Sequence, residues 1–246
     1  MRFDYTLQQD SRAQVGLIVL QADETVEDDF RTLLPASLNV LVNRVPSGLD
    51  VTPATLKETA SHLTQAARLF PQGLSFDAVG FACTSASAQI GSEAVADTVR
   101  RGTETAHVSN PLSALITACK ALNISRLALL SPYVESVSEQ LRTVLQSAGI
   151  ATPVFGTFAE AEEARVARIS ADSIEHATRA LCQDASVDGV FLSCTNLRTL
   201  SVLKSLGTDL QLPVLSSNLV LAWHLWHLAQ PETAPQSPLD MTPHSL

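Results

Sequence analysis

Two Cys-Thr pairs, Cys83-Thr84 and Cys194-Thr195, are the residues of this sequence best suited to chemistry. Each pair ends an apolar run that is typical of a strand buried in a parallel sheet, and an Asp stands six residues before each Cys. One such run could be a core strand that happens to end in Cys. Two of them in one chain indicate a pair of thiols that face a shared cleft.

The spacing of the two cysteines extends to other segments. They lie 111 positions apart, and the same shift aligns residues 16–20 (GLIVL) with residues 127–130 (LALL). Apolar strand patterns alternate with helical patterns in both halves, which predicts parallel sheets covered by helices on both faces. We therefore expect an α/β fold of two pseudo-symmetric parallel-sheet domains, with the active site between them.

The same patterns predict the domain boundaries. Residues 1–13 form a polar arm, residues 14–115 the first α/β half and residues 116–218 the second. The final apolar helix, 219–229, is expected to pack on the first half. Residues 231–246 hold four prolines and few apolar groups, so we expect a disordered tail.

Composition limits the class of protein. With 246 residues, of which 46% are hydrophobic and 17% charged, the chain can bury a substantial core. A net charge of -9 argues against a nucleic-acid partner, and no apolar run approaches the ~18 residues that cross a membrane. Four cysteines without a dense pattern favour a reducing, cytoplasmic location.

Cofactors and partners can be judged from the same residues. No Gly-rich phosphate motif follows a predicted strand, so a nucleotide cofactor has no support. His224 and His227 have helical spacing, but no third ligand is near them in the sequence, and no metal is expected. The neighbouring Trp223 and Trp226 make the final helix apolar enough to need cover, which predicts a homodimer or higher homo-oligomer.

A pair of thiols offers two kinds of chemistry. A thiolate is a base and a nucleophile, while a neutral thiol is an acid, with a reference pKa of about 8.5. Two thiols on opposite sides of one carbon could remove a proton from one face and return one to the other, which inverts a stereocentre without a cofactor. Alternatively, one sulfur could add to an activated alkene while the other protonates the product. Either reaction needs donors for an oxyanion, which the side chains and amides beside the cysteines could supply: Thr84, Ser85, Thr195 and Asn196.

With these residues placed, the chain resembles the aspartate/glutamate racemase superfamily over nearly its whole length. Within it, the chain is most similar to the branch of maleate cis-trans isomerase and arylmalonate decarboxylase, and there to the ectoine-utilisation racemase-like proteins. The segments that carry the resemblance are GLIVLQADETVEDDF, FACTSASAQIG, LALLSPYVESV, PVFGTFAEAEEARVARI, VFLSCTNLRT and PVLSSNLVLAWH. The resemblance implies catalytic thiols at Cys83 and Cys194 and a substrate-binding Tyr133. Because the decarboxylases of the family have only the second thiol, Cys83 argues against decarboxylation.

Two departures from the maleate isomerases bear on the substrate. Gln21 stands where those enzymes carry an Asn after the first strand, and Glu163 (or Glu162, within the alignment error) stands where they carry a second Asn. A carboxylate at the second position would repel a second substrate carboxylate and attract an amino or amidinium group. The resemblance therefore favours a substrate with one carboxylate and one cationic nitrogen, such as ectoine, hydroxyectoine or an open-chain diamino acid.

Three hypotheses for function follow. The first is a cofactor-independent racemase or epimerase that acts on a small amino-acid-like carboxylate, with Cys83 and Cys194 as the acid/base pair, in ectoine or hydroxyectoine breakdown. The second is a maleate-type cis-trans isomerase in which Cys83 adds to the double bond. The third is a non-catalytic protein that uses the same cleft to bind a metabolite.

Overall fold

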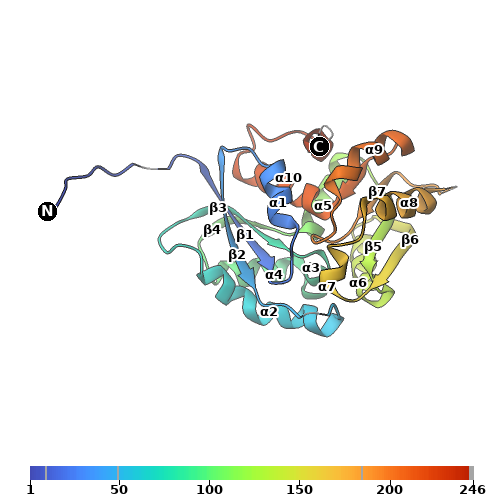
Figure 1. The fold of residues 1–246 in the computed structure, drawn as a ribbon, viewed down its shortest axis with the longest axis horizontal. Helices are drawn as coiled ribbons and strands as arrows, with labels where there is room; N and C mark the ends of the chain where they lie inside the picture. The colour runs from blue at the N-terminus through green and yellow to red at the C-terminus, as the bar shows by residue number, and fades with distance from the viewer. Residues whose placement is uncertain (9, 49, 184, 244–246) are drawn as a thin grey trace.

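The computed structural model describes residues 1–8, 10–48, 50–183 and 185–243, which form two four-stranded parallel sheets (Figure 1). The strand order is β2-β1-β3-β4 in the first sheet and β6-β5-β7-β8 in the second. The same order in both sheets confirms the predicted pseudo-symmetric α/β fold. The strands are β1 (Ala13–Leu20), β2 (Leu38–Val45), β3 (Phe76–Ala82), β4 (Thr105–Ser109), β5 (Arg126–Tyr133), β6 (Ala151–Glu160), β7 (Gly189–Leu192) and β8 (Val214–Ser216).

Helices connect successive strands and cover the sheets. They are α1 (Val26–Leu33), α2 (Pro53–Arg68), α3 (Thr84–Ile90), α4 (Ser92–Arg100), α5 (Pro111–Ala121), α6 (Glu135–Ser147), α7 (Glu163–Val166), α8 (Ala171–Cys182), α9 (Leu200–Leu210) and α10 (Ser217–Ala229), with a short 3-10 helix, η1 (Pro238–Met241). Helix α2 begins at the Thr-Pro signal of the sequence, because Thr52 accepts the backbone N–H of Thr55.

The aspartates that precede the two cysteines have a structural role. Asp77 accepts the backbone N–H of Gln14 at 2.7 Å, and Asp188 accepts the backbone N–H and the hydroxyl of Ser125 at 3.0 and 2.9 Å. In each half the bond ties the start of the strand that bears the cysteine to the start of the neighbouring strand. The repeated aspartates therefore fix the alignment of neighbouring strands, while the cysteines lie at the opposite, carboxyl ends of these strands.

The last helix returns to the first half. Helix α10 packs on α5, β3 and α1, and Figure 1 shows it beside α1. The approach is tight at Gly80 on β3, where a Cβ atom would lie 2.7 Å from Leu225 Cδ1 and would push that side chain aside. The first sheet is thus covered by a helix that comes from the end of the chain.

The expectation of a disordered tail is wrong for its described part. Residues 231–243 fold back over α10, where the indole N–H groups of Trp223 and Trp226 donate to Pro235 O at 2.8 Å and Thr233 Oγ1 at 3.1 Å. Pro238 begins η1 and Pro243 follows it closely, so these prolines belong to an ordered turn of the segment. Residues 244–246 of the predicted tail lie outside the described residues. Because the tail covers the Trp face of α10, the reason given for a dimer does not hold, and the oligomeric state stays a prediction.

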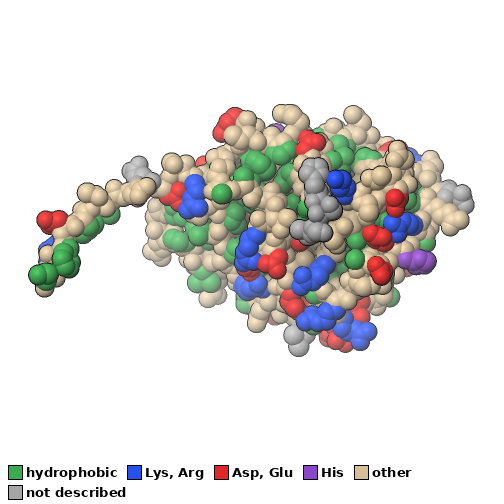
Figure 2. All heavy atoms as spheres, turned by 45° about the horizontal axis from the view of Figure 1, so that its top comes forward, with side chains coloured by type: hydrophobic (Ala, Val, Ile, Leu, Met, Phe, Trp, Pro, Cys, Tyr) green, Lys and Arg blue, Asp and Glu red, His purple; other side chains and the backbone are tan. Residues whose placement is uncertain are grey.

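The surface and the N-terminal arm complete the fold. Residues 1–8 extend from the body, and Met1, Phe3, Tyr5 and Leu7 are all exposed (Figures 1 and 2). Figure 2 shows Lys and Arg side chains interspersed with Asp and Glu on the face that it presents, an arrangement that does not favour a nucleic-acid surface. Among the described helices, none is long and apolar enough to cross a membrane.

Candidate active site

Cys83 lies at the carboxyl end of β3, where the chain enters α3. It is the N-cap residue of that helix, and its Sγ accepts the backbone N–H of Ala86 at 3.4 Å. The residue is 6% exposed. Ligands of parallel sheets bind beyond the carboxyl ends of the strands, so the fold delivers this thiol to the expected place.

Cys194 lies at the equivalent end of β7 and has a different backbone. Its φ of 110° is in the left-handed region, and its N–H donates to Ser217 Oγ at 2.9 Å. Its Sγ lies 2.9 Å from Tyr133 Oη and accepts the backbone N–H of Asn196 at 3.3 Å. This thiol is 4% exposed and contacts groups from both β5 and its own loop.

A buried carboxylate holds the tyrosine and the asparagine of the site. Glu163 begins α7, is 4% exposed, and accepts the Tyr133 hydroxyl at Oε1 (2.8 Å) and the Asn196 amide at Oε2 (3.0 Å). Glu162, the alternative in the sequence alignment, is exposed. The structure thus brings Glu163, Tyr133, Asn196 and Cys194 together.

The remaining predicted donors join the two halves. Thr84 Oγ1 lies 2.7 Å from Ser217 Oγ, and Thr195 Oγ1 donates to Ala82 O at 3.3 Å. Asn196 Oδ1 accepts the backbone N–H of Glu24 at 2.8 Å, which ties the loop after β7 to the loop after β1. Ser85 is buried beside Cys83. Since the Asn196 side chain is already bonded on both sides, it positions the site more than it offers a free donor.

Gln21 lies outside this cluster. It follows β1 but its side chain is exposed, whereas Asp23, two residues further on, is 4% exposed. Asp23 interacts electrostatically with Cys83, Cys194 and Glu163, so it belongs to the site. The sequence alone does not single out Asp23, because an Asp just before a helical pattern is common at a helix start. In the structure Thr25 is the N-cap residue of α1 but its side chain makes no capping bond, and Asp23 Oδ1 accepts the N–H groups of Thr25 and Val26 at 2.8 and 2.9 Å.

Burial keeps the thiols neutral at rest. It raises the pKa of Cys83 to about 12 and that of Cys194 well above its usual value, and the negative charges of Glu163 and Asp23 raise both further. The N–H of Ala86 opposes the rise at Cys83, and the Tyr133 hydroxyl opposes it at Cys194. Burial also raises the pKa of Glu163, against the hydrogen bonds from Asn196 and Tyr133. The cluster therefore contains two acidic side chains, Glu163 and Asp23, whose negative charge affects which ligands can bind there.

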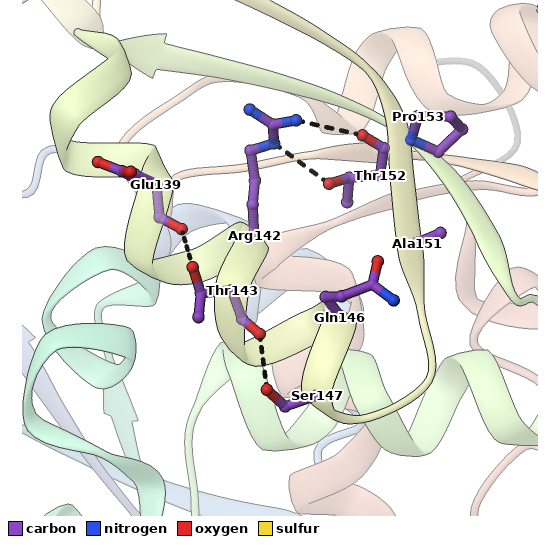
Figure 3. Close-up of a pocket in the computed structure, with 8 residues that line it drawn as sticks. All are labelled: Glu139, Arg142, Thr143, Gln146, Ser147, Ala151, Thr152 and Pro153. Carbon is purple, nitrogen blue, oxygen red and sulfur yellow. Dashed lines mark hydrogen bonds between the residues drawn. The ribbon is translucent and has the colours of Figure 1, made fainter.

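A hollow of the surface lies away from the thiols. A depression of about 460 Å³ opens between α6 and the start of β6 (Figure 3). Arg142 crosses it to Thr152, while Thr143 and Ser147 bond the backbone of their own helix. It lies at the amino ends of β5 and β6, and the thiols lie at the carboxyl ends of the strands. Among the described residues, no group of three or more His, Cys, Asp or Glu side chains is arranged to hold a metal ion.

Two buried thiols at equivalent strand ends, one of them bonded to a tyrosine held by a buried carboxylate, define a pseudo-symmetric α/β protein with a cysteine-based site between its halves. Comparison with known proteins agrees. The arylmalonate decarboxylase family model matches residues 15–239, and the chain belongs to that family.

Individual relatives carry two different activities. The chain is 27% identical to arylmalonate decarboxylase of Bordetella bronchiseptica, over 91% of this chain and 93% of that protein. It is 24% identical to maleate isomerase of Nocardia farcinica, over 83% of this chain and 85% of that protein. A solved structure of a Cys-to-Ser variant of the Nocardia farcinica maleate cis-trans isomerase, with a covalently bound succinylcysteine intermediate, has a TM-score of 0.82 at 20% identity and covers 94% of this chain and 99% of that one. The predicted branch of the superfamily, that of arylmalonate decarboxylase and maleate isomerase, is thereby confirmed. The narrower assignment to the ectoine-utilisation proteins stays a prediction.

Proposed function

We propose that this protein is a cofactor-independent racemase or epimerase that uses Cys83 and Cys194 as an acid/base pair on a small amino-acid-like carboxylate. The observation that carries the proposal is the placement of both thiols, buried, at the carboxyl ends of the equivalent strands β3 and β7. The negative charges of Glu163 and Asp23 raise the pKa of both thiols. Two acid/base groups that approach one carbon from opposite halves are what inversion requires.

The chemistry needs one thiol ionised and the other protonated. The ionised thiol removes the proton next to the substrate carboxylate, and the neutral thiol returns a proton to the opposite face. Negative charge develops on the carboxylate oxygens during this transfer, where the hydroxyls of Thr84, Ser85 and Thr195 and the nearby amides can stabilise it. Because the cluster is closed in the structure, a substrate must displace the groups that cover the thiols, and the resulting dry site strengthens a weak thiol base.

The carboxylates of the site favour a substrate that carries a cationic nitrogen. Glu163 and Asp23 are both buried and both raise the pKa of the thiols. A second substrate carboxylate would meet repulsion from them, while an ammonium or amidinium group would be attracted. Ectoine, hydroxyectoine or an open-chain diamino acid fits this requirement, in line with the resemblance to ectoine-utilisation racemase-like proteins.

A second candidate is maleate-type cis-trans isomerisation, which the relationship to maleate isomerase favours. In that reaction Cys83 adds to the double bond and Cys194 protonates the adjacent carbon. The buried carboxylates count against a dianionic substrate. A trapped adduct on Cys83, detected by mass spectrometry, would establish the addition, since racemisation needs no covalent intermediate.

Proton NMR in deuterium oxide tests the proposal directly. The purified protein is incubated in turn with ectoine, hydroxyectoine, aspartate and maleate. We expect loss of the signal of the proton next to the carboxylate in one of the cationic candidates, together with the appearance of the other enantiomer. Conversion of maleate to fumarate would favour the isomerase instead. If none of the four compounds exchanges a proton or is isomerised, the proposal is rejected for these compounds and the hypothesis of a non-catalytic metabolite-binding protein is favoured.

A further inference from the structure

One carboxylate oxygen at the site lacks the hydrogen bonds that both oxygens of Glu163 accept. Asp23 is 4% exposed, and its Oδ1 accepts two backbone N–H groups at the start of α1. Its other oxygen, Oδ2, is buried without a hydrogen-bond partner among the described residues. A buried carboxylate oxygen without a donor is costly, because it has lost its water and gained nothing in return.

The orphaned oxygen belongs to the space around the thiols. The Asp23 charge acts on Cys83, Cys194 and Glu163. Burial raises the pKa of Asp23, and the approach of the Thr195 hydroxyl lowers it. That hydroxyl donates to Ala82 O at 3.3 Å, so it does not complete the contacts of Oδ2. The Oδ1 atom of Asp23 accepts two N–H groups at the start of α1, so the carboxylate cannot rotate without breaking two hydrogen bonds to the backbone. Asp23 is thus fixed with one acceptor left open at the site.

Glu163 is the other buried carboxylate, but its contacts are complete. Tyr133 donates to Oε1 and Asn196 donates to Oε2. A ligand that bound Glu163 directly would have to break one of these bonds. Of the two carboxylates, Asp23 is therefore the one with an acceptor ready for a ligand.

The cation that attracts Asp23 does not reach this oxygen. Arg44 donates to the backbone oxygens of Leu20, Gln21 and Asp23 at 3.1, 3.1 and 2.9 Å, and its other nitrogen bonds Glu27. The guanidinium therefore fixes the loop after β1 from outside.

We infer that Asp23 Oδ2 binds the cationic nitrogen of the substrate, an ammonium or amidinium N–H, and so selects a zwitterion over a dicarboxylate. The inference rests on the proposed function for the location of the site, but it concerns recognition and not inversion. A cation at this position also lowers the excess of negative charge beside the thiols. Substrate binding would then favour ionisation of a thiol, which restricts the reactive form to the occupied site.

The test compares two achiral probes of similar size, β-alanine and succinate, by ligand-observed NMR titration of the full chain. β-Alanine carries one ammonium and one carboxylate, and succinate carries two carboxylates. We expect the wild type to prefer β-alanine. In Asp23→Asn an N–H₂ donor replaces the open acceptor, while Asn still caps α1. We expect this variant to lose about tenfold or more of its β-alanine affinity and to bind succinate more tightly, since a hydrogen bond to a charged group is lost.

Asp29→Asn is the matched control. Asp29 is also a buried Asp near α10, but its Oδ2 already accepts the Asn218 amide at 2.7 Å. We expect this variant to keep the wild-type preference between the two probes. Thermal unfolding of both variants checks that each is folded.

The outcomes separate this inference from the proposed function. Loss of the β-alanine preference in Asp23→Asn alone supports the inference, even if no chiral candidate exchanges its proton. Unchanged preference in Asp23→Asn overturns it, as does a wild type that binds succinate and not β-alanine. A wild type that binds neither probe at the highest concentration tested also overturns it. Inversion of ectoine with an unaltered KM in Asp23→Asn would leave the proposed function intact and reject the role of Asp23.

Discussion

The two halves of the molecule present the same residue at the same strand end in two different settings. Cys83 has extended backbone, with a φ of -154°, and its sulfur accepts a backbone N–H from the helix that follows. Cys194 has a φ of 110°, and its sulfur contacts the Tyr133 hydroxyl as well as a backbone N–H. The pseudo-symmetry therefore fixes where the thiols lie, while the loops make them chemically distinct.

A second asymmetry comes from the end of the chain. The shift that aligns the two cysteines places Asp29 of α1 opposite Gln140 of α6. Asp29 is buried and bonded to Asn218 of α10, whereas Gln140 is exposed. Because α10 packs on α1 and α5, the first half carries a buried polar network that the second half does not reproduce at this position. This network also reaches the site, since Asn218 donates to Thr195 O at 2.8 Å.

The largest expected effect tests whether the two thiols act as opposite bases. Cys83→Ser and Cys194→Ser should each reduce inversion by about 10³-fold, because a hydroxyl cannot replace the thiol as an acid or base. Each variant keeps one thiol, so in deuterium oxide each should still exchange the proton of one enantiomer, and the two variants should exchange opposite enantiomers. Chiral chromatography with proton NMR measures both. Full inversion in either variant, or exchange of the same enantiomer in both, would contradict the two-base mechanism.

The next effect concerns the buried network of the first half. Burial raises the pKa of Asp29 from 3.8 to about 7, the Asn218 amide opposes the rise, and the charges of Asp23 and Asp28 add to it while Arg198 opposes it. Between these pH values the native state holds a proton that the unfolded state has released. The Asp29 contribution to stability is thus fully present below about pH 4 and is lost as the pH rises towards 7, with a slope approaching ~1.4 kcal/mol per pH unit.

Asp29→Asn removes that dependence and keeps an acceptor for Asn218. We expect its Tm to exceed that of the wild type by a margin that grows as the pH rises from about 4 to about 7, the range between the two pKa values of Asp29. Gln140→Glu, at the exposed position that aligns with Asp29, is the control and should show no such trend. Parallel Tm curves for the wild type and Asp29→Asn would mean that Asp29 ionises in the fold as freely as in the unfolded chain.

The sequence predicted the symmetric features better than the asymmetric ones. The apolar runs that begin at Asp77 and Asp188 correctly predict the two strands that bear the cysteines, because a strand buried on both faces has a strong apolar pattern. Helix α3 (Thr84–Ile90) has no helical pattern in the sequence, since its small side chains are buried without helical periodicity. Asp23 was missed because its role depends on the turn of a loop, which local propensity does not specify.

The C-terminal segment shows the same limit in another form. Proline content predicts that residues 231–246 are disordered, but the indoles of α10 provide donors that hold the described part in place. Glu163 was placed in the site through resemblance, and its partners Tyr133 and Asn196 lie 30 and 33 residues away in the chain. Such contacts depend on the order of the strands in the sheet. The internal repeat of the sequence indicates that this order is the same in both halves, but it does not show which distant residues meet.

A smaller effect should separate the two thiols without removing either. Tyr133→Phe deletes the hydroxyl that contacts Cys194 and opposes the rise of its pKa, and it leaves the Ala86 contact of Cys83 intact. We expect the alkylation rate of Cys194 by iodoacetamide to fall about tenfold relative to that of Cys83, which corresponds to roughly one pKa unit. Mass spectrometry of the labelled peptides gives both rates. Tyr5→Phe, on the exposed arm, is the control, and an unchanged or increased ratio in Tyr133→Phe would show that the hydroxyl does not tune Cys194.

The smallest expected effect isolates the backbone difference. A non-glycine residue in the left-handed region is strained by roughly 1 kcal/mol or more, and glycine is not. Cys194→Gly relieves that strain at a φ of 110°, whereas Cys83→Gly, at a φ of -154°, relieves none and adds only flexibility to the unfolded chain. Both substitutions remove the same side chain from a buried position. Urea denaturation should therefore find Cys194→Gly more stable than Cys83→Gly by about 1 kcal/mol. If the two variants unfold at the same urea concentration, the backbone at Cys194 stores no strain, and the two thiols differ only in the side chains around them.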